Sequence, residues 1–178
     1  MAADTYRSVL SRFVTGVTVV TTLDDPDGAA QPFGTTVNAF GSVSLDPPLV
    51  LVTIGRERSI LPVIARTRRF AVNILAEGDQ GLADCFAGAP STIPRTDFCG
   101  AAWTPSANGQ PLLADALATI ACELEQTIEA GDHLLHLGRV VELRASDRRD
   151  WPLLYYRRRY LRIEHAAAVD LRGKPDAT

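Results

Sequence analysis

Apolar residues recur along this chain in short runs of β-branched or alternating character, the pattern typical of β-strands. Three such runs are VTVVTT at 17–22, LVLVTI at 49–54 and FAVNIL at 70–75. The run at 49–54 is a continuous apolar segment, so we expect that strand to be buried on both faces. A further strand is expected at 35–40, between a turn at 24–28 and a Pro-containing turn at 44–48.

The alternation is clearest in the second half of the chain. At 118–128, apolar side chains alternate with polar ones, which predicts a half-buried strand. The AGDH turn at 130–133 leads into a second strand at 134–143, so the two should form a hairpin. A last strand is expected over 156–163.

Three short helices complete the pattern. Asp4 is expected to cap the first and Gly16 to end it, Ser59 caps the second, and the third spans 79–87. Residues 88–110, rich in Gly, Pro, Ser and Thr, predict a long loop of the kind that is usually functional or mobile. Six or more short strands with only short helices predict a mainly β protein with an all-β barrel.

The composition fits a single globular domain. The chain has 178 residues, of which 46% are hydrophobic and 22% charged, and this excludes a disordered or collagen-like protein. A net charge of −3 argues against a nucleic-acid partner. No apolar run reaches the ~20 residues of a membrane span. We expect one domain at 1–165 and a frayed tail at 166–178.

The three cysteines bear on the compartment. The first residues contain no basic stretch followed by an apolar core, so we expect no signal peptide and a cytoplasmic protein. Cys85, Cys99 and Cys122 are then expected to be reduced. Each lies in an apolar stretch, which favours a small core side chain over a reactive thiol.

Several common sites are absent from the sequence. It contains no G-x-G-x-x-G after a strand, no phosphate-binding G-x-x-x-x-G-K-[ST] and no G-x-S-x-G. His133 and His136 are three positions apart along a strand, and an odd offset sends their side chains to opposite faces. We therefore expect no metal site.

The chain resembles the flavin reductase family with the FMN-binding split barrel across residues 5–163. The blocks that carry the resemblance occur in order: RFVTGVTVVTT (12–22), GTTVNAFGSVSLDPPLVLVTI (34–54), FAVNIL (70–75), FCGAAW (98–103), GQPLLADALATIAC (109–122), AGDHLLHLGRV (130–140) and PLLYYRRRY (152–160). The resemblance implies a Greek-key split β-barrel with short flanking helices. One departure is Asp97, which stands before Phe98 where the family commonly has a basic residue.

The resemblance also implies a function. It indicates an NAD(P)H:flavin oxidoreductase that transfers a hydride from NADH or NADPH to FMN or FAD and supplies the reduced flavin to a partner monooxygenase. It further implies a homodimer with flavin near the subunit boundary. The residues do not choose between the two flavins or the two nicotinamides. The alternative is a flavin- or haem-binding split-barrel carrier or sensor without turnover, whereas the motifs of a pyridoxamine-phosphate oxidase do not match.

The resemblance places the flavin ring along a polar seam. The seam residues are Thr36, Val37, Asn38, Ala39, Phe40, Ser42 and Val43. A flavin's pyrimidine edge carries acceptors and an N–H, and the Asn38 side chain offers one acceptor and two donors. Without the resemblance, the same residues would be an ordinary strand edge rich in Thr and Asn.

The flavin phosphate is expected where the strand at 49–54 runs into GRERS. An arginine and a helix N-terminus both attract anions. By resemblance, the contributors at this end are Thr53, Ile54, Arg58 and Ser59, with Phe86 near the flavin. The alternative for Arg56 and Arg58 is a solvated turn.

His133 is the candidate for the reduction step. It lies in the turn of a predicted hairpin, and the resemblance places it near the nicotinamide. There it would orient the nicotinamide or supply a proton to reduced flavin, because the cofactors carry out the hydride transfer themselves. The alternative is a surface histidine paired with Asp132. Tyr160, beside Arg159, is the second catalytic candidate.

Overall fold

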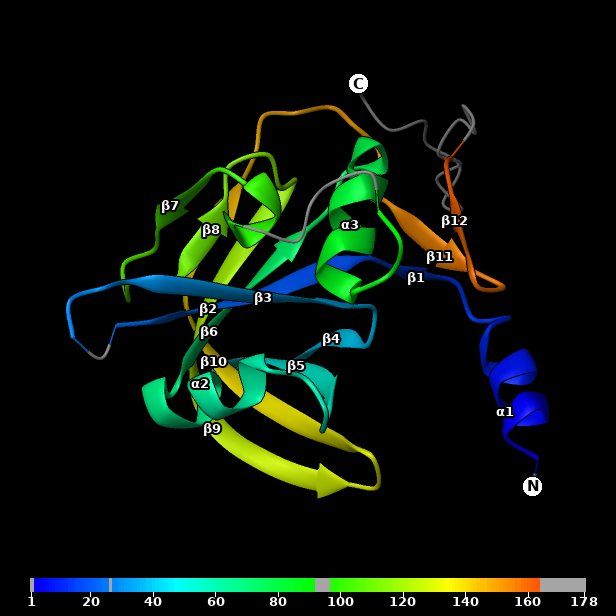
Figure 1. Cartoon of the computed structure of the whole chain (residues 1–178), viewed down its shortest axis with the longest axis horizontal. Coiled ribbons are helices and arrows are strands. Elements are labelled where there is room, and N and C mark those ends of the chain that lie inside the picture. Colours follow the sequence, from blue (N-terminus) through cyan, green and yellow to red (C-terminus); the bar gives the residue numbers. More distant parts are fainter. Residues whose placement is uncertain (1, 26, 92–96, 164–178) are drawn as a thin grey trace.

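The computed structural model describes residues 2–25, 27–91 and 97–163, and its core is a seven-stranded antiparallel sheet (Figure 1). The sheet order is β3-β2-β6-β9-β10-β5-β4. The elements in chain order are α1 (Ala3–Leu10), β1 (Thr15–Gly16), β2 (Thr18–Asp24), β3 (Gln31–Val37), β4 (Phe40–Leu45), β5 (Pro48–Gly55), α2 (Ile60–Thr67), β6 (Arg69–Ile74), η1 (Glu77–Asp79), α3 (Gln80–Ala87), η2 (Asp97–Gly100), β7 (Trp103–Pro105), β8 (Pro111–Leu113), β9 (Ala118–Ala130), β10 (His133–Ala145), β11 (Leu154–Tyr156) and β12 (Arg159–Leu161). The expected tail at 166–178 lies outside the described residues.

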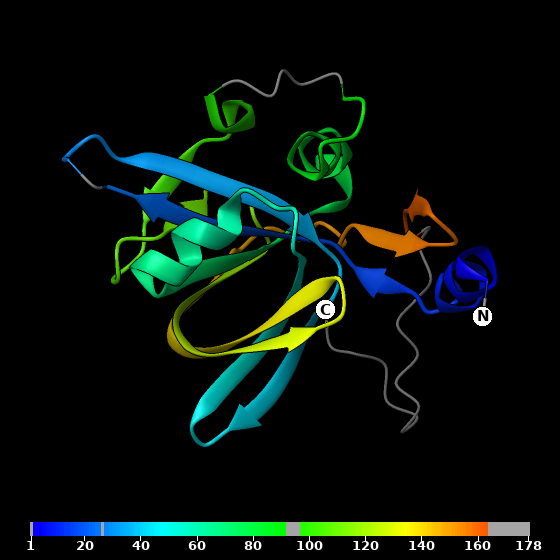
Figure 2. The same cartoon turned by 60° about the horizontal axis from the view of Figure 1, so that its bottom comes forward.

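The strands carry the core, as the periodicity predicted. Alternate residues of β2, β5, β6 and β9 meet in one cluster that includes Val20, Val52, Phe70 and Ile120, and α2 adds Ile64 to it. Helix α3 packs against β3, and β9 and β10 form the predicted hairpin. The mainly β class is therefore confirmed. Figure 2 shows α2 and α3 as separate short helices outside the strands, with the β4–β5 hairpin projecting from the body.

Two strand predictions need correction. The expected strand at 35–40 is wrong, because β3 ends at Val37 and β4 begins at Phe40. Asn38 and Ala39 form the corner between them, and the Ala39 carbonyl accepts a hydrogen bond from the Thr53 N–H of β5 (3.0 Å). The expectation that the strand at 49–54 is buried on both faces is also wrong. In β5, buried residues alternate with half-buried ones.

The chain ends and the long loop also differ from expectation. Helix α1 begins after Ala2 and ends at Leu10, so neither Asp4 nor Gly16 bounds it. The expected last strand is a short hairpin, since Arg157 and Arg158 turn the chain with φ of 49° and 63°. The expected loop at 88–110 contains η2 and β7, and its residues 92–96 lie outside the described part.

The expectation of three reduced cysteines is wrong for two of them. Cys85 on α3 and Cys99 on η2 form a disulfide, with their Cα atoms 6.2 Å apart. Their separation along the chain gave no sign of this, because the bond depends on how α3 and η2 are placed in the fold. Cys122 is a buried free cysteine, as expected, and burial raises the pKa of its thiol to about 12.

Among the described residues, no helix has the length and apolar character needed to cross a membrane.

His136 is a buried histidine in β10. Its Nδ1 shares a hydrogen bond with the Thr127 hydroxyl (3.0 Å), whereas Nε2 has no partner in the described part of the chain. His133 is exposed, so the two histidines do face different surroundings. Desolvation lowers the pKa of His136 below its ordinary value of 6.5, which keeps the folded-state ring neutral.

Stability should therefore fall as the pH drops below 6.5, because the unfolded chain then takes up a proton that folded His136 resists. The slope of this contribution is up to about 1.4 kcal/mol per pH unit. Urea unfolding of wild type and His136→Leu across pH 5 to 8 measures it. The variant should lose this part of the pH dependence, and identical pH profiles would contradict the prediction.

Candidate functional site

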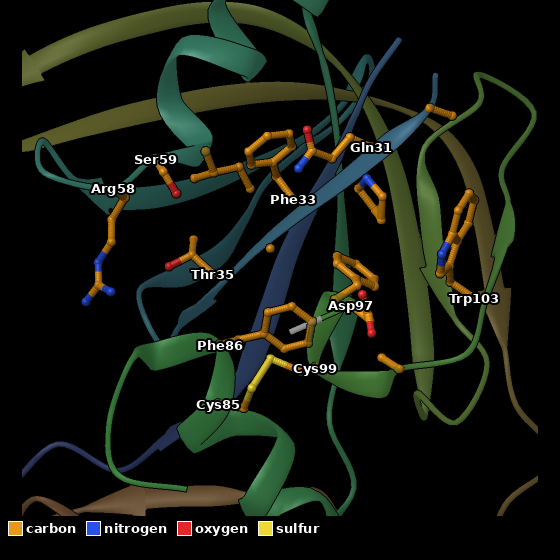
Figure 3. A pocket seen from close by; sticks show the side chains of 16 residues that line it. Gln31, Phe33, Thr35, Arg58, Ser59, Cys85, Phe86, Asp97, Cys99 and Trp103 are labelled. Carbon is orange, nitrogen blue, oxygen red and sulfur yellow. A yellow bond between two sulfur atoms is a disulfide. The ribbon is translucent and has the colours of Figure 1, made fainter. Parts of the chain in front are cut away.

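Two cavities open side by side and meet at Thr35 and Arg58. The first encloses about 750 Å³ between β3, the start of α2, α3 and η2 (Figure 3). The second encloses about 490 Å³ between the β3–β4 corner, the end of β5 and the β9–β10 turn. The two together form a continuous, mostly polar site on one side of β3.

The predicted seam contributes unequally to this site. The Thr36 hydroxyl donates to the Ala83 carbonyl of α3 (2.6 Å), so that side chain secures α3 to β3. Val37 is buried in the core and also borders the second cavity. Asn38 and Ala39 are exposed at the corner and line the second cavity. The available hydrogen-bonding groups of the seam are therefore concentrated at the corner.

The remaining seam residues lie further along β4. Phe40 borders a third, apolar hollow of about 880 Å³ beside α1. Ser42 and Val43 line none of these three cavities, and the Val43 side chain is exposed. The structure thus brings Asn38 and Ala39 into the site but leaves Ser42 and Val43 outside it.

The end where the cavities meet is suited to an anion. Arg58 lies there, with one guanidinium nitrogen donating to the Ala87 carbonyl (2.8 Å) and another 3.2 Å from a Glu57 carboxylate oxygen. Ser59 stands at the N-terminus of α2, as predicted, but its side chain makes no capping hydrogen bond. The Ser59 hydroxyl and the remaining guanidinium N–H groups of Arg58 can therefore serve a ligand.

Thr35 is the site residue that the sequence reasoning missed. It is 3% exposed, and its hydroxyl has no hydrogen-bond partner among the described residues. Figure 3 shows this hydroxyl, the Ser59 hydroxyl and the Arg58 side chain around one space. A buried hydroxyl without a partner is unfavourable, so its place at the cavity junction indicates a ligand that completes it. Only its position in the sequence, next to the seam, could have suggested it.

Phe86 forms the aromatic wall of the first cavity. It lies so close to β3 that a Cβ at Gly34 would be 2.5 Å from its ring, which explains the glycine. The Phe98 ring meets the Phe86 ring edge to face, with 5.0 Å between the ring centroids. Asp97 and Trp103 line the same cavity, and no described residue pairs with the Asp97 carboxylate.

His133 lies at the second cavity, where β10 begins. Its Nδ1 is 2.7 Å from a carboxylate oxygen of Asp132, and this hydrogen bond lowers the pKa of Asp132. Arg56 donates to the Gly131 carbonyl (2.9 Å) and pairs with Glu129, so it holds the β9–β10 turn in place. The alternative role of Arg56 as a turn residue is thus the one that its contacts support.

Both β5 candidates line the second cavity, where Thr53 is half-buried and Ile54 is also part of the core cluster. Tyr160 is apart from His133. Its ring packs on Tyr155 with 5.3 Å between the ring centroids, and it lines neither the first nor the second cavity. Burial raises the pKa of Tyr160 well above its ordinary range.

Comparison with known proteins identifies the family. The family described as flavin reductase like domain matches residues 10–164. The chain belongs to this family. A reductase subunit of a flavin-dependent monooxygenase, HsaB from Rhodococcus jostii, is a relative with 39% identity over 171 residues, which covers 96% of this chain and 83% of the relative.

Other members of the flavin reductase like family agree in sequence and fold. A flavin reductase (NADH) from Kitasatospora aureofaciens is 40% identical over 162 residues, or 89% of this chain and 81% of the relative. The solved structure of Streptomyces globisporus C-1027 NADH:FAD oxidoreductase SgcE6 in complex with NAD and FAD fragments superposes with a TM-score of 0.79 at 32% identity. It covers 92% of this chain and 94% of that one, and it confirms the predicted split-barrel fold.

Proposed function

We propose that this protein is an NAD(P)H:flavin oxidoreductase that reduces FMN or FAD and passes the reduced flavin to a partner monooxygenase. The observation that carries the proposal is the pair of joined cavities, with hydrogen-bonding groups at one end and an anion site with an unsatisfied buried hydroxyl at the junction. That combination fits a flat, polar ring joined to a phosphate. Membership of the flavin reductase like family supports the same function.

The residues present fit a flavin. Asn38 and the backbone of Ala39 would bind the ring edge in the second cavity, with Thr53 beneath them on β5. Thr35, Arg58 and Ser59 would hold the phosphate at the junction. When bound, the flavin supplies the hydride acceptor, and the chain's own residues position it and exclude water.

His133 is proposed to orient the nicotinamide or to hold a proton for the reduced flavin. The hydrogen bond to Asp132 fixes the imidazole through Nδ1 and leaves Nε2 available to a ligand in the second cavity. Holding two rings in the reactive arrangement is the main contribution a protein can make to such a step. Tyr160 is proposed only as a secondary contributor, because it packs on Tyr155 and does not line the second cavity with His133.

Steady-state oxidation of NADH by the purified protein tests this function. Rapid NADH loss should require added FMN or FAD, and the same assay with NADPH ranks the two nicotinamides. A protein that binds flavin without flavin-dependent NADH loss would be the carrier or sensor instead.

The oxygenase partner is proposed because HsaB, a relative, is named as a monooxygenase reductase subunit. We place the protein in the cytoplasm, where NADH is available.

Replacing Thr35 by valine should weaken FMN binding about fivefold, because one hydrogen bond contributes roughly 1 kcal/mol. Riboflavin lacks the phosphate, so its affinity should not change. Thr119→Val is the matched control, since Thr119 also has a buried hydroxyl without a described partner but lines none of the three cavities. Fluorescence titrations with both ligands measure the effect. Equal losses for FMN and riboflavin would remove Thr35 from the phosphate site.

The protein should be a homodimer in solution. Helix α1 buries none of its side chains and stands beside the sheet in Figure 1, and Phe13 just beyond it is 76% exposed. The apolar hollow beside α1 shares Asn38, Ala39 and Thr53 with the second cavity, so a subunit covering it would reach the flavin. The interface should exceed the ~1,000 Å² of a biological contact. A monomer mass by light scattering at micromolar concentration would contradict this prediction.

A further inference from the structure

The wall of the first cavity contains a disulfide bond. The Cys85–Cys99 disulfide joins the last turn of α3 to η2, and both cysteines line the cavity (Figure 3). Cys85 is 2% and Cys99 is 7% exposed, so the bond forms part of the packed wall rather than a surface link. Phe86 and Phe98, each next to one of the two cysteines in sequence, meet edge to face in the same wall.

The segment that the disulfide holds has a strained backbone. Asp97, Phe98 and Cys99 have φ values of 51°, 58° and 57°, and Gly100 follows at 65°. A run of left-handed non-glycine residues is sterically unfavourable and persists only when its surroundings enforce it. Besides the disulfide, the described restraints are the packing of Cys99 and Phe98 in one core cluster, the aromatic contact, and one hydrogen bond from the Ala101 N–H to the Phe98 carbonyl (3.1 Å).

We propose that Cys85 and Cys99 are a reversible thiol–disulfide pair whose oxidation state sets the shape of the first cavity and hence its affinity for flavin. The inference rests on the proposed function for its ligand and its compartment. Disulfides of cytosolic proteins are usually transient, catalytic or redox-sensing, which favours a reversible bond here. The pair lines the first cavity together with Thr35, Arg58 and Ser59, the residues proposed to hold the flavin phosphate, so a change in this wall would alter FMN binding.

The chemistry requires a peroxide in one direction and a dithiol in the other. In oxidation, one cysteine thiolate attacks the O–O bond of hydrogen peroxide, which breaks to give a sulfenic acid and hydroxide, protonated to water. The second thiolate attacks the sulfenic sulfur, the S–S bond forms, and hydroxide leaves and takes a proton to become a second water. In reduction, a dithiol attacks the disulfide, and its own oxidation to a disulfide releases both cysteines as thiols. Two electrons pass in each direction.

Reduction should relax the cavity wall. Without the bond, residues 97–99 can return to right-handed backbone conformations, and Phe98 can leave Phe86. Helix α3 should stay in place, because the Thr36 hydroxyl bonds its Ala83 carbonyl independently. A less organised wall lowers affinity for the ligand that it contacts.

A count of reactive thiols tests the first half of the proposal. The full chain is purified without reductant and divided into an untreated sample and one reduced with dithiothreitol. Each sample is unfolded in the presence of N-ethylmaleimide, which labels free thiols, and peptide masses identify the labelled cysteines. One labelled cysteine, Cys122, is expected before treatment and three after it. Peroxide added to the reduced protein should restore the first result. Three labelled cysteines in the untreated protein, or no recovery with peroxide, would overturn the proposal.

FMN affinity tests the second half. Reduction should raise the Kd for FMN about tenfold, and reoxidation should restore it. Cys122→Ala is the matched control and should behave as wild type, while Cys85→Ala/Cys99→Ala should show the weaker affinity under both conditions. Equal affinity in both states of the wild type would overturn the proposal. If neither state binds FMN, the proposed function fails, and amide hydrogen exchange at 97–101 decides instead: faster exchange after reduction supports the pair's role, and equal exchange overturns it.

Discussion

Replacing His133 by alanine should lower kcat/KM for NADH ten- to a hundred-fold, while flavin affinity stays nearly unchanged. The expectation rests on two effects. A misplacement of about 1 Å between reacting rings can reduce a rate ~10²-fold, and loss of one proton donor has a smaller effect in a step that the cofactors carry out. His133 lines the second cavity from the end of a hairpin, and its ring is fixed by Asp132.

Stopped-flow reduction of the enzyme–flavin complex across NADH concentrations measures this loss directly. Asp132→Asn provides a graded comparison, because it keeps His133 but weakens the bond that orients the ring, and it should give a smaller loss. Unchanged reduction kinetics in His133→Ala would leave His133 as a surface histidine paired with Asp132. Loss of flavin binding would place it among the cofactor-binding residues instead.

Replacing Asn38 by leucine should weaken flavin binding about tenfold or more. The leucine keeps the volume but removes one acceptor and two donors at the β3–β4 corner, and leaving a desolvated ring edge without partners costs ~1–3 kcal/mol. Because Asn38 is exposed and outside the core, the free energy of unfolding should change little.

Titration with FMN and riboflavin separates this effect from that of Thr35. Asn38→Leu should weaken both ligands equally, since both share the ring, whereas Thr35→Val should weaken FMN alone. Wild-type affinity in Asn38→Leu would mean that the ring lies elsewhere.

The strands were predictable because their side chains obey a local period. The apolar run at 70–75 predicts β6, and the turn at 130–133 predicts the β9–β10 hairpin, without any knowledge of the fold. The β3–β4 corner was not predictable, because Asn38 and Ala39 continue an acceptable strand sequence and the bend depends on the hydrogen bond from Thr53 of β5. The half-buried face of β5 was missed for a similar reason: a run of apolar residues does not show whether packed protein or a cavity covers each face.

In the site, too, local motifs predicted some residues, whereas others depend on contacts made only in the folded chain. Arg58, Ser59, Asn38 and His133 were found from motifs, and the structure brings them to two adjoining cavities. Thr35 and the Cys85–Cys99 bond depend on which buried atoms face each other across the fold, and no local pattern records that. The separation of Tyr160 from His133 was equally unpredictable from the sequence, because it depends on how the β11–β12 hairpin lies against α3.

The decisive measurement is an anaerobic titration of the purified protein and one equivalent of FMN with NADH. The flavin's visible absorbance should disappear as one equivalent of NADH is consumed, far faster than in a mixture of FMN and NADH alone. Admission of air should restore the oxidised spectrum. A flavin that binds to the protein but is reduced no faster than free FMN would contradict the assignment of this chain as a flavin reductase.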